Sequence, residues 1–144
     1  MLSESSTRFC TVAVAHLDRS EGTAQLTVAV GGHPPPIMAR ADGSVEELSV
    51  EGTLLGLVDD PNLTDVSTVL APGETVLLYT DGVTEANAPS TVWTPSDLAG
   101  VVAGCDGRAP QTMIDHVAKA ALSDLSAPPR DDVAMLALRL QPAG

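Results

Sequence analysis

Apolar runs separated by turn residues make up the first half of the chain. Residues 9–17 (FCTVAVAHL) are almost all apolar and partly β-branched, which is typical of a strand buried on both faces. Residues 24–30 resume strand character after a turn marked by Asp18, Ser20 and Gly22. The pattern therefore predicts an antiparallel hairpin closed by a loop of more than two residues.

A second, more exposed hairpin is predicted from residues 37–40 and 45–50. The Asp42-Gly43 pair between them is a common signal for a tight turn. Residues 52–62 then read as a loop.

Two more strands follow this loop. Residues 63–70 alternate moderately between apolar and polar side chains, and residues 74–80 (ETVLLYT) form an apolar run. This run ends abruptly at Asp81 and Gly82, so we expect a buried strand with a carboxylate directly at its end.

Two helices are predicted in the last third of the chain. Thr94, Pro95 and Asp97 provide a capping hydroxyl, a first-turn proline and an acid near the positive end of the dipole, for a short helix to about Gly104. Residues 110–125 carry apolar side chains at intervals of three and four, as in a helix with one buried face.

The chain closes with residues 133–140 (VAMLALRL), a strand that is apolar on both faces at most positions. Such strands need covering layers in an antiparallel protein. The predicted fold class is therefore α+β: two antiparallel β-sheets packed as a sandwich, with flanking helices, in a single domain over residues 1–144.

Composition narrows the possible partners. The 144 residues include 19 acidic and 7 basic side chains, and the net charge of −12 repels nucleic acid and anionic lipid. Cys10 and Cys105 fit no metal or redox spacing and are interpreted as reduced thiols. Because no long apolar run occurs and the segment Met1–Arg8 is polar, we expect a cytoplasmic protein that does not contact a membrane.

Carboxylates at two strand ends are the candidates for chemistry. Asp81 follows one apolar strand, while Asp131 and Asp132 precede the last one. Two such strand ends that lie side by side would offer oxygen ligands to Mg²⁺ or Mn²⁺. Asp-Gly and Asp-Asp pairs also occur simply as turns, and that interpretation stays open.

The string GGHPPP (residues 31–36) combines permissive glycines with a stiff triproline exit. His33 within it is a candidate general acid or metal ligand, although the absence of a second histidine nearby in the sequence favours a structural role. No Gly-x-Ser-x-Gly elbow and no phosphate-binding glycine motif occurs, so the sequence supports neither a serine hydrolase nor a nucleotide cofactor.

Taken together and in order, four motifs resemble the carboxyl-terminal portion of PPM-type (type 2C-like) protein serine/threonine phosphatases, specifically the stage II sporulation protein E (SpoIIE-like) group. The resemblance covers about residues 9–140. Its motifs are GGHPPPIMARADG, LLG, APGETVLLYTDGVTEA and PPRDDVAMLALRL.

The resemblance implies a site and a reaction. It assigns catalytic, metal-binding roles to Asp81 and Asp131, and it adds Gly82 and Asp132 to the metal site. Two Mn²⁺ or Mg²⁺ ions would supply a hydroxide that attacks phosphoserine or phosphothreonine, without a phosphoenzyme. In this bacterial group the substrate is usually an anti-sigma-factor antagonist.

The resemblance also leaves part of the family pattern without a counterpart. The strands, acidic motifs and helices that open family members are not found before residue 9, so we expect an amino-terminally truncated domain with an incomplete metal site and doubtful activity. Exposed sheet edges would favour a homodimer. A catalytically silent regulatory or protein-binding module, or a structural domain with acidic turns, remain alternatives.

Overall fold

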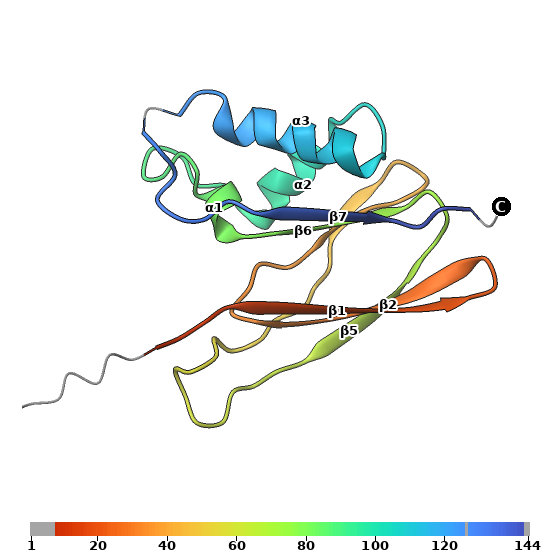
Figure 1. The fold of residues 1–144 in the computed structure, drawn as a ribbon, viewed down its shortest axis with the longest axis horizontal. Helices are drawn as coiled ribbons and strands as arrows, with labels where there is room; N and C mark the ends of the chain where they lie inside the picture. The colour runs from red at the N-terminus through yellow and green to blue at the C-terminus, as the bar shows by residue number, and fades with distance from the viewer. Residues whose placement is uncertain (1–7, 126, 143–144) are drawn as a thin grey trace, which may run out of the picture.

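The computed structural model describes residues 8–125 and 127–142. Two antiparallel sheets are stacked face to face, and helices cover the outer face of one of them (Figure 1). The sheets have the strand orders β1-β2-β5 and β4-β3-β6-β7. The elements, in chain order, are β1 (Val12–Ser20), β2 (Thr23–Gly31), β3 (Ile37–Ala39), β4 (Val45–Glu47), β5 (Asp65–Leu70), β6 (Thr75–Tyr79), α1 (Asp81–Thr84), α2 (Pro95–Ala103), α3 (Pro110–Leu122) and β7 (Met135–Arg139). The predicted fold class is confirmed.

The first hairpin is tighter than its sequence suggests. Strands β1 and β2 pair without interruption up to Ser20 opposite Thr23, which leaves only Glu21 and Gly22 in the loop. Gly22 has φ +78, a conformation that glycine adopts at little cost. The expected loop of more than two residues is therefore wrong, because the polar residues that suggested a turn continue the ladder.

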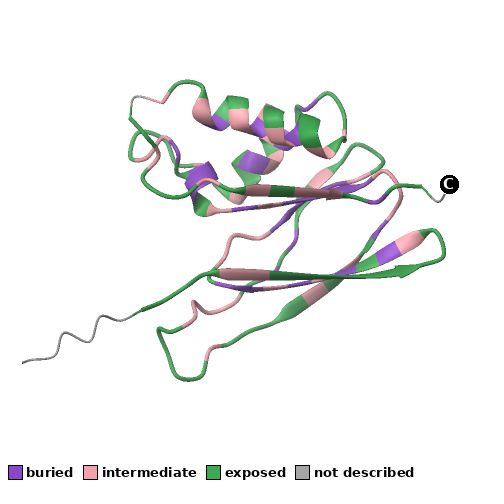
Figure 2. Cartoon of the chain, viewed as in Figure 1, coloured by how far each residue is buried: buried purple, intermediate pink, exposed green. Residues whose placement is uncertain are grey.

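Strand β1 is not buried on both faces, which corrects the prediction for residues 9–17. It is an edge strand, paired only with β2 among the described residues, and its outward-facing Val14 is 58% exposed. Burial instead alternates in β2, and buried segments lie where the two sheets face each other (Figure 2). Leu26 and Val28 of β2 are fully buried in one cluster with Met38 of the other sheet. Apolar content alone could not distinguish an edge strand from a central one.

The second hairpin departs from prediction in one strand. Strand β3 lies between β4 and β6 and is fully buried, with Ile37 and Met38 both at 0% exposure. Only β4 has the expected exposure at Glu46 and Glu47. The central position of β3 in the sheet, which a pattern of three residues cannot reveal, explains the difference.

Helices α2 and α3 form as predicted and pack on the four-stranded sheet (Figure 1). Thr94 and Asp97 form a reciprocal capping box at the start of α2. Between the helices and the sheet lies one buried apolar cluster, which includes Leu98 and Val102 of α2 and Met113 and Val117 of α3. The flanking layer is thus held by ordinary helix-on-sheet packing.

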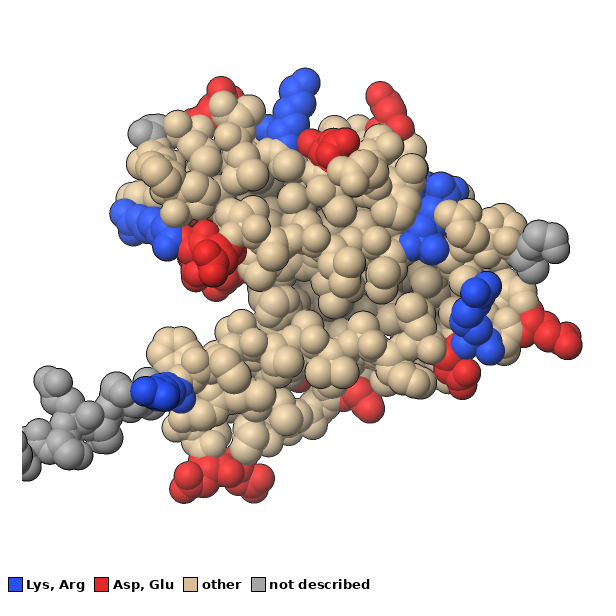
Figure 3. All heavy atoms as spheres, in the orientation of Figure 1, with Lys and Arg blue, Asp and Glu red and all other residues tan. Residues whose placement is uncertain are grey.

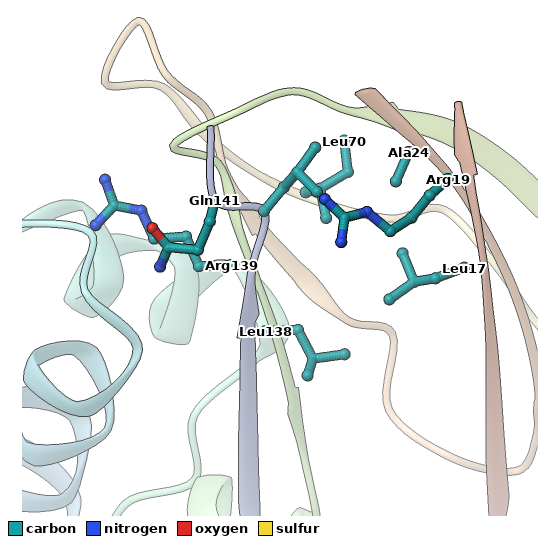
Figure 4. Close-up of a pocket in the computed structure, with 8 residues that line it drawn as sticks. Leu17, Arg19, Ala24, Leu70, Leu138, Arg139 and Gln141 are labelled. Atoms are coloured by element: carbon teal, nitrogen blue, oxygen red, sulfur yellow. The ribbon is translucent and has the colours of Figure 1, made fainter. Parts of the chain in front are cut away.

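The sandwich is open along one side, where edge strands β1 and β7 face each other. Leu136 of β7 is 55% exposed, so the last strand is not buried on both faces as expected. A groove of about 300 Å³ lies between the sheets here, lined by Leu17, Leu70 and Leu138 among others (Figure 4). Arg19 extends toward the groove, whereas Arg139 points away from it.

Arg40 ties the two sheets together at the end where β3 stops. Its guanidinium donates to Glu46 at 2.7 Å and to Glu74 at 3.1 Å on the side of the four-stranded sheet. On the other sheet it donates to the Val69 carbonyl at 2.8 Å and to the Thr68 hydroxyl at 2.9 Å. Burial by itself lowers the pKa of Arg40. The hydrogen bonds and charges of Glu46 and Glu74 outweigh this effect, so the pKa is raised above its ordinary value.

Within residues 8–125 and 127–142, no helix has the length and apolar character needed to cross a membrane. The polar segment Met1–Arg8, from which we expected no targeting role, lies outside the described residues except for Arg8.

Candidate functional site

Thr80 joins the end of β6 to the segment that leads into β7. Its hydroxyl donates to the carbonyl oxygen of Asp132 at 2.7 Å and accepts from the N–H of Ala134 at 2.9 Å. Its own N–H donates to the Ala134 carbonyl at 3.0 Å. Three hydrogen bonds thus hold the two strand ends side by side. Apart from its place in the YTDG motif, no feature of the sequence predicts this role of Thr80.

Gly82 is buried against the same segment. A Cβ placed on it would lie 2.8 Å from the carbonyl carbon of Asp132 and 3.1 Å from the carbonyl oxygen of Asp131, closer than a real side chain allows. Glycine is therefore required here by the close approach of two backbones. The predicted convergence of the two strand ends is present in the structure.

Asp81 begins the short helix α1, where the sequence predicts only a turn. The helix forms because the Asp81 carbonyl accepts from the Glu85 N–H at 2.8 Å and from the Thr84 hydroxyl at 3.0 Å. Four residues are too few for apolar periodicity to reveal a helix. The Asp81 residue is exposed, so its carboxylate is accessible to solvent ions.

Asp131 and Asp132 are also exposed. The Oδ1 atom of Asp131 accepts a hydrogen bond from the Asp132 N–H at 2.8 Å, which restrains the Asp131 side chain. Among the described residues neither aspartate takes part in an ion pair. Acidic atoms gather at this end of the strands, beside a notch between the two layers (Figure 3).

The donor chemistry fits a divalent cation, but the described residues supply only part of a site. Asp81 and Asp131 are oxygen donors on adjoining backbone segments, as Mg²⁺ and Mn²⁺ prefer. No group of three or more His, Cys, Asp or Glu side chains in the described part of the chain is placed to hold a metal ion.

His33 borders the same end of the sandwich. It lines a hollow of about 240 Å³ together with Thr80 of the β6 end and Ala134 of the segment before β7. The other histidines lie elsewhere: His16 is exposed on β1, and the His116 ring bonds the Val101 carbonyl between the two helices at 3.0 Å. Cys10 and Cys105 are both free thiols.

The groove in Figure 4 does not belong to this site. It lies at the opposite end of β7, beside Leu138 and Gln141, and its lining is mostly apolar. The candidate site is therefore the region where β6 ends and β7 begins.

Comparison with known proteins relates the chain to phosphatases. A family model described as stage II sporulation protein E (SpoIIE) matches residues 1–141. Protein IcfG of Synechocystis sp. is 32% identical over 82 residues, which are 57% of this chain and 13% of IcfG.

Solved structures give the same picture. The phosphatase domain of the cell fate determinant SpoIIE from Bacillus subtilis, presoaked with Mn, matches with a TM-score of 0.72 at 16% identity, over 92% of this chain and 58% of that chain. The RsbU and RsbW domains of Rv1364c from Mycobacterium tuberculosis match with a TM-score of 0.72 at 27% identity, over 93% and 38% respectively. The chain thus spans less than two thirds of these relatives.

Proposed function

Because the chain belongs to the stage II sporulation protein E family, we propose that it carries the carboxyl-terminal part of a metal-dependent phosphatase that acts on phosphoserine or phosphothreonine of a regulatory protein. The observation that supports this most directly is the contact between the Asp81-Gly82 and Asp131-Asp132 segments. Phosphatase domains among the solved relatives share this fold.

Asp81 and Asp131 would hold the divalent cations, with Gly82 and Asp132 completing this side of the metal site. Bound Mn²⁺ or Mg²⁺ supplies a hydroxide at neutral pH by lowering the pKa of water. Thr80 keeps the two aspartate segments in register through its bonds to Asp132 and Ala134. The role of the protein residues is therefore to hold the cations in place. Hydroxide is the nucleophile in this proposal, so no side chain needs to act as one.

We include the substrate and setting in the proposal. An anti-sigma-factor antagonist is the substrate that kinship with the SpoIIE group favours. A reducing, cytoplasmic environment is supported by the two thiols, since Cys10 and Cys105 form no disulfide. A homodimer through the open edge of β1 is part of the same proposal, because an apolar edge strand is a template for pairing.

A catalytically silent binding module is the second candidate function. The observation in its favour is that Asp81, Asp131 and Asp132 belong to no group of three ligand-forming side chains placed to hold a metal ion in the described residues. A fold that covers 58% of a SpoIIE phosphatase domain could bind a protein without hydrolysing a phosphoester.

Hydrolysis of p-nitrophenyl phosphate and of a phosphoserine protein, measured with and without Mn²⁺, distinguishes the phosphatase from the silent binding module. The phosphatase proposal predicts Mn²⁺-dependent turnover that Asp81→Asn and Asp131→Asn abolish, since an amide replaces an anionic ligand. Asp106→Asn is the matched control, because Asp106 is an exposed aspartate on the loop between α2 and α3. Absence of both turnover and Mn²⁺ binding in the wild type would favour the silent module.

A further inference from the structure

The hollow beside the candidate metal site has two kinds of wall. One is apolar and is formed by Ala13 of β1, Leu78 of β6 and Leu136 of β7, whereas the Met135 side chain packs on the opposite face of the sheet. The other is formed by His33, which the connection between β2 and β3 brings to the hollow. A hollow of about 240 Å³ is large enough for a side chain of a bound peptide, although not for a whole drug-sized ligand.

His33 supplies the polar side chain of this hollow that is not already engaged. The hydroxyl of Thr80 is used twice, as a donor to Asp132 and as an acceptor from Ala134. The hydroxyl of Tyr79 is buried in the cluster beneath the helices. Within the described residues the imidazole of His33, by contrast, is half-buried and has no side-chain hydrogen bond, so it can donate to a ligand.

The backbone around His33 is held in place from both sides. Before it, the N–H of Gly32 donates to the Gly52 carbonyl at 2.7 Å, and the φ of +61 at Gly32 suits glycine. After it, three prolines fix their own φ angles, and the Pro36 carbonyl accepts from the Leu48 N–H at 2.8 Å. This stiffness presents the imidazole at one position and lowers the entropy cost of using it to bind a ligand.

The charges on either side of His33 indicate which side an anion would approach. His33 also lines a second hollow of about 360 Å³, whose other lining residues include Glu47 and Glu51. Both carboxylates would repel a phosphate. The hollow of about 240 Å³ has no carboxylate in its lining and reaches Thr80, the residue before Asp81, where bound divalent cations would make the local charge more positive.

We infer that this hollow is a subsite for the phosphorylated segment of the substrate. His33 donates a hydrogen bond to a phosphoryl oxygen, and the apolar wall formed by Ala13, Leu78 and Leu136 takes an apolar side chain next to the phosphorylated residue. The inference rests on the proposed function, and it adds a preference for an apolar neighbour. On this inference, the GGHPPP motif holds the imidazole of His33 beside the candidate metal site.

Binding of synthetic peptides tests the subsite without relying on turnover. The probes are a phosphoserine peptide with leucine neighbours, the same peptide with glycine neighbours, and an unphosphorylated version. Binding is followed by NMR with Mg²⁺ present, because Mg²⁺ is diamagnetic and offsets the carboxylate charge. The variants are His33→Ala and the matched control His16→Ala, since His16 is exposed on β1.

We expect the phosphorylated leucine peptide to shift the His33 ring signals and to leave those of His16 unchanged. His33→Ala should weaken binding at least about tenfold, as for a lost hydrogen bond to a charged group, while His16→Ala should not. Glycine neighbours should weaken it about five- to tenfold through lost apolar burial. Thermal unfolding of each variant verifies that it is folded.

Equal affinity of His33→Ala and His16→Ala, or no binding of the phosphopeptide by the wild type, would overturn the subsite. The proposed function has a separate readout, which is Mn²⁺-dependent hydrolysis. Hydrolysis that His33→Ala leaves unchanged in kcat/KM would contradict the subsite and keep the phosphatase. Phosphopeptide binding through His33 without any hydrolysis would keep the subsite and contradict the phosphatase.

Discussion

The hydroxyl of Thr80 donates a 2.7 Å hydrogen bond to the carbonyl oxygen of Asp132, across 52 positions in the sequence. It links the residue before Asp81 to one of the two candidate aspartates at the start of β7. The relative position of the two candidate metal-binding segments therefore depends in part on the side chain of Thr80, in addition to the pairing of β6 with β7.

We predict that Thr80→Val lowers the free energy of unfolding by about 1–3 kcal/mol, because valine leaves the Asp132 carbonyl and the Ala134 N–H without this partner. Urea denaturation measures the change. Thr80→Ser keeps the hydroxyl and should lower the free energy of unfolding much less. Equal losses for serine and valine would mean that the methyl group, not the hydrogen bonds, is what matters at this position.

Gly82→Ala should destabilise the protein by about 1–3 kcal/mol or more, since the added methyl group meets the Asp132 backbone. Gly100 in α2 provides the matched control: its Cβ position is open, so Gly100→Ala should stabilise the helix by roughly 0.5–1 kcal/mol. We expect the denaturant midpoint to fall for Gly82→Ala and to rise for Gly100→Ala. A neutral Gly82→Ala would show that the two backbones can separate at little cost.

Mn²⁺ should stabilise the wild type by about 2.7 kcal/mol at roughly 100 times its Kd, as for any ligand that binds only the folded state. Asp81→Asn and Asp131→Asn should remove most of this gain, and metal-free stability should be unchanged or higher in both, because carboxylate repulsion is relieved. Thermal shifts with and without Mn²⁺ measure both effects. A full Mn²⁺ shift in either variant would exclude that aspartate as a ligand.

Asp97 should make the stability of the protein depend on pH in the acid range. Hydrogen bonds from the backbone N–H and the hydroxyl of Thr94 hold the pKa of Asp97 below its ordinary value. Because the folded pKa is depressed, this stabilisation is complete above the unfolded pKa of about 3.9 and is lost as pH falls through the folded value.

The Asp97→Asn variant should therefore show a shallower loss of stability below about pH 4 than the wild type. Urea midpoints measured between neutral and acid pH give the comparison. The exposed Asp106 offers a control, since Asp106→Asn removes a carboxylate that has no such cap. Parallel pH profiles for wild type and Asp97→Asn would show that the capping box does not contribute to the acid response.

Local signals predicted the parts of the fold that depend on neighbours in sequence. The cap at Thr94 and the apolar spacing in residues 110–125 predict α2 and α3, and both helices form, with α3 ending at Leu122. Strand position within a sheet depends on distant partners. For that reason β1 was expected to be buried and β3 exposed, and the structure reverses both.

The candidate site was predictable in part for the same reason. Asp81 and Asp131 could be paired from their places at strand ends, and the structure brings their segments together. The closeness of His33 could not be predicted, because it requires the β2–β3 connection, the β6 end and the segment before β7 to meet at one hollow. Single motifs carry no information about such three-way packing.

The order in which the site can assemble follows from the place of β7 in the chain. Strand β7 is the final element and pairs only with β6 among the described residues. Asp81 and Asp131 are some fifty residues apart in the sequence, so their segments come together only when β7 has paired with β6. This long-range pairing closes a loop that contains α1, α2 and α3, and until it forms the two carboxylates are not held side by side.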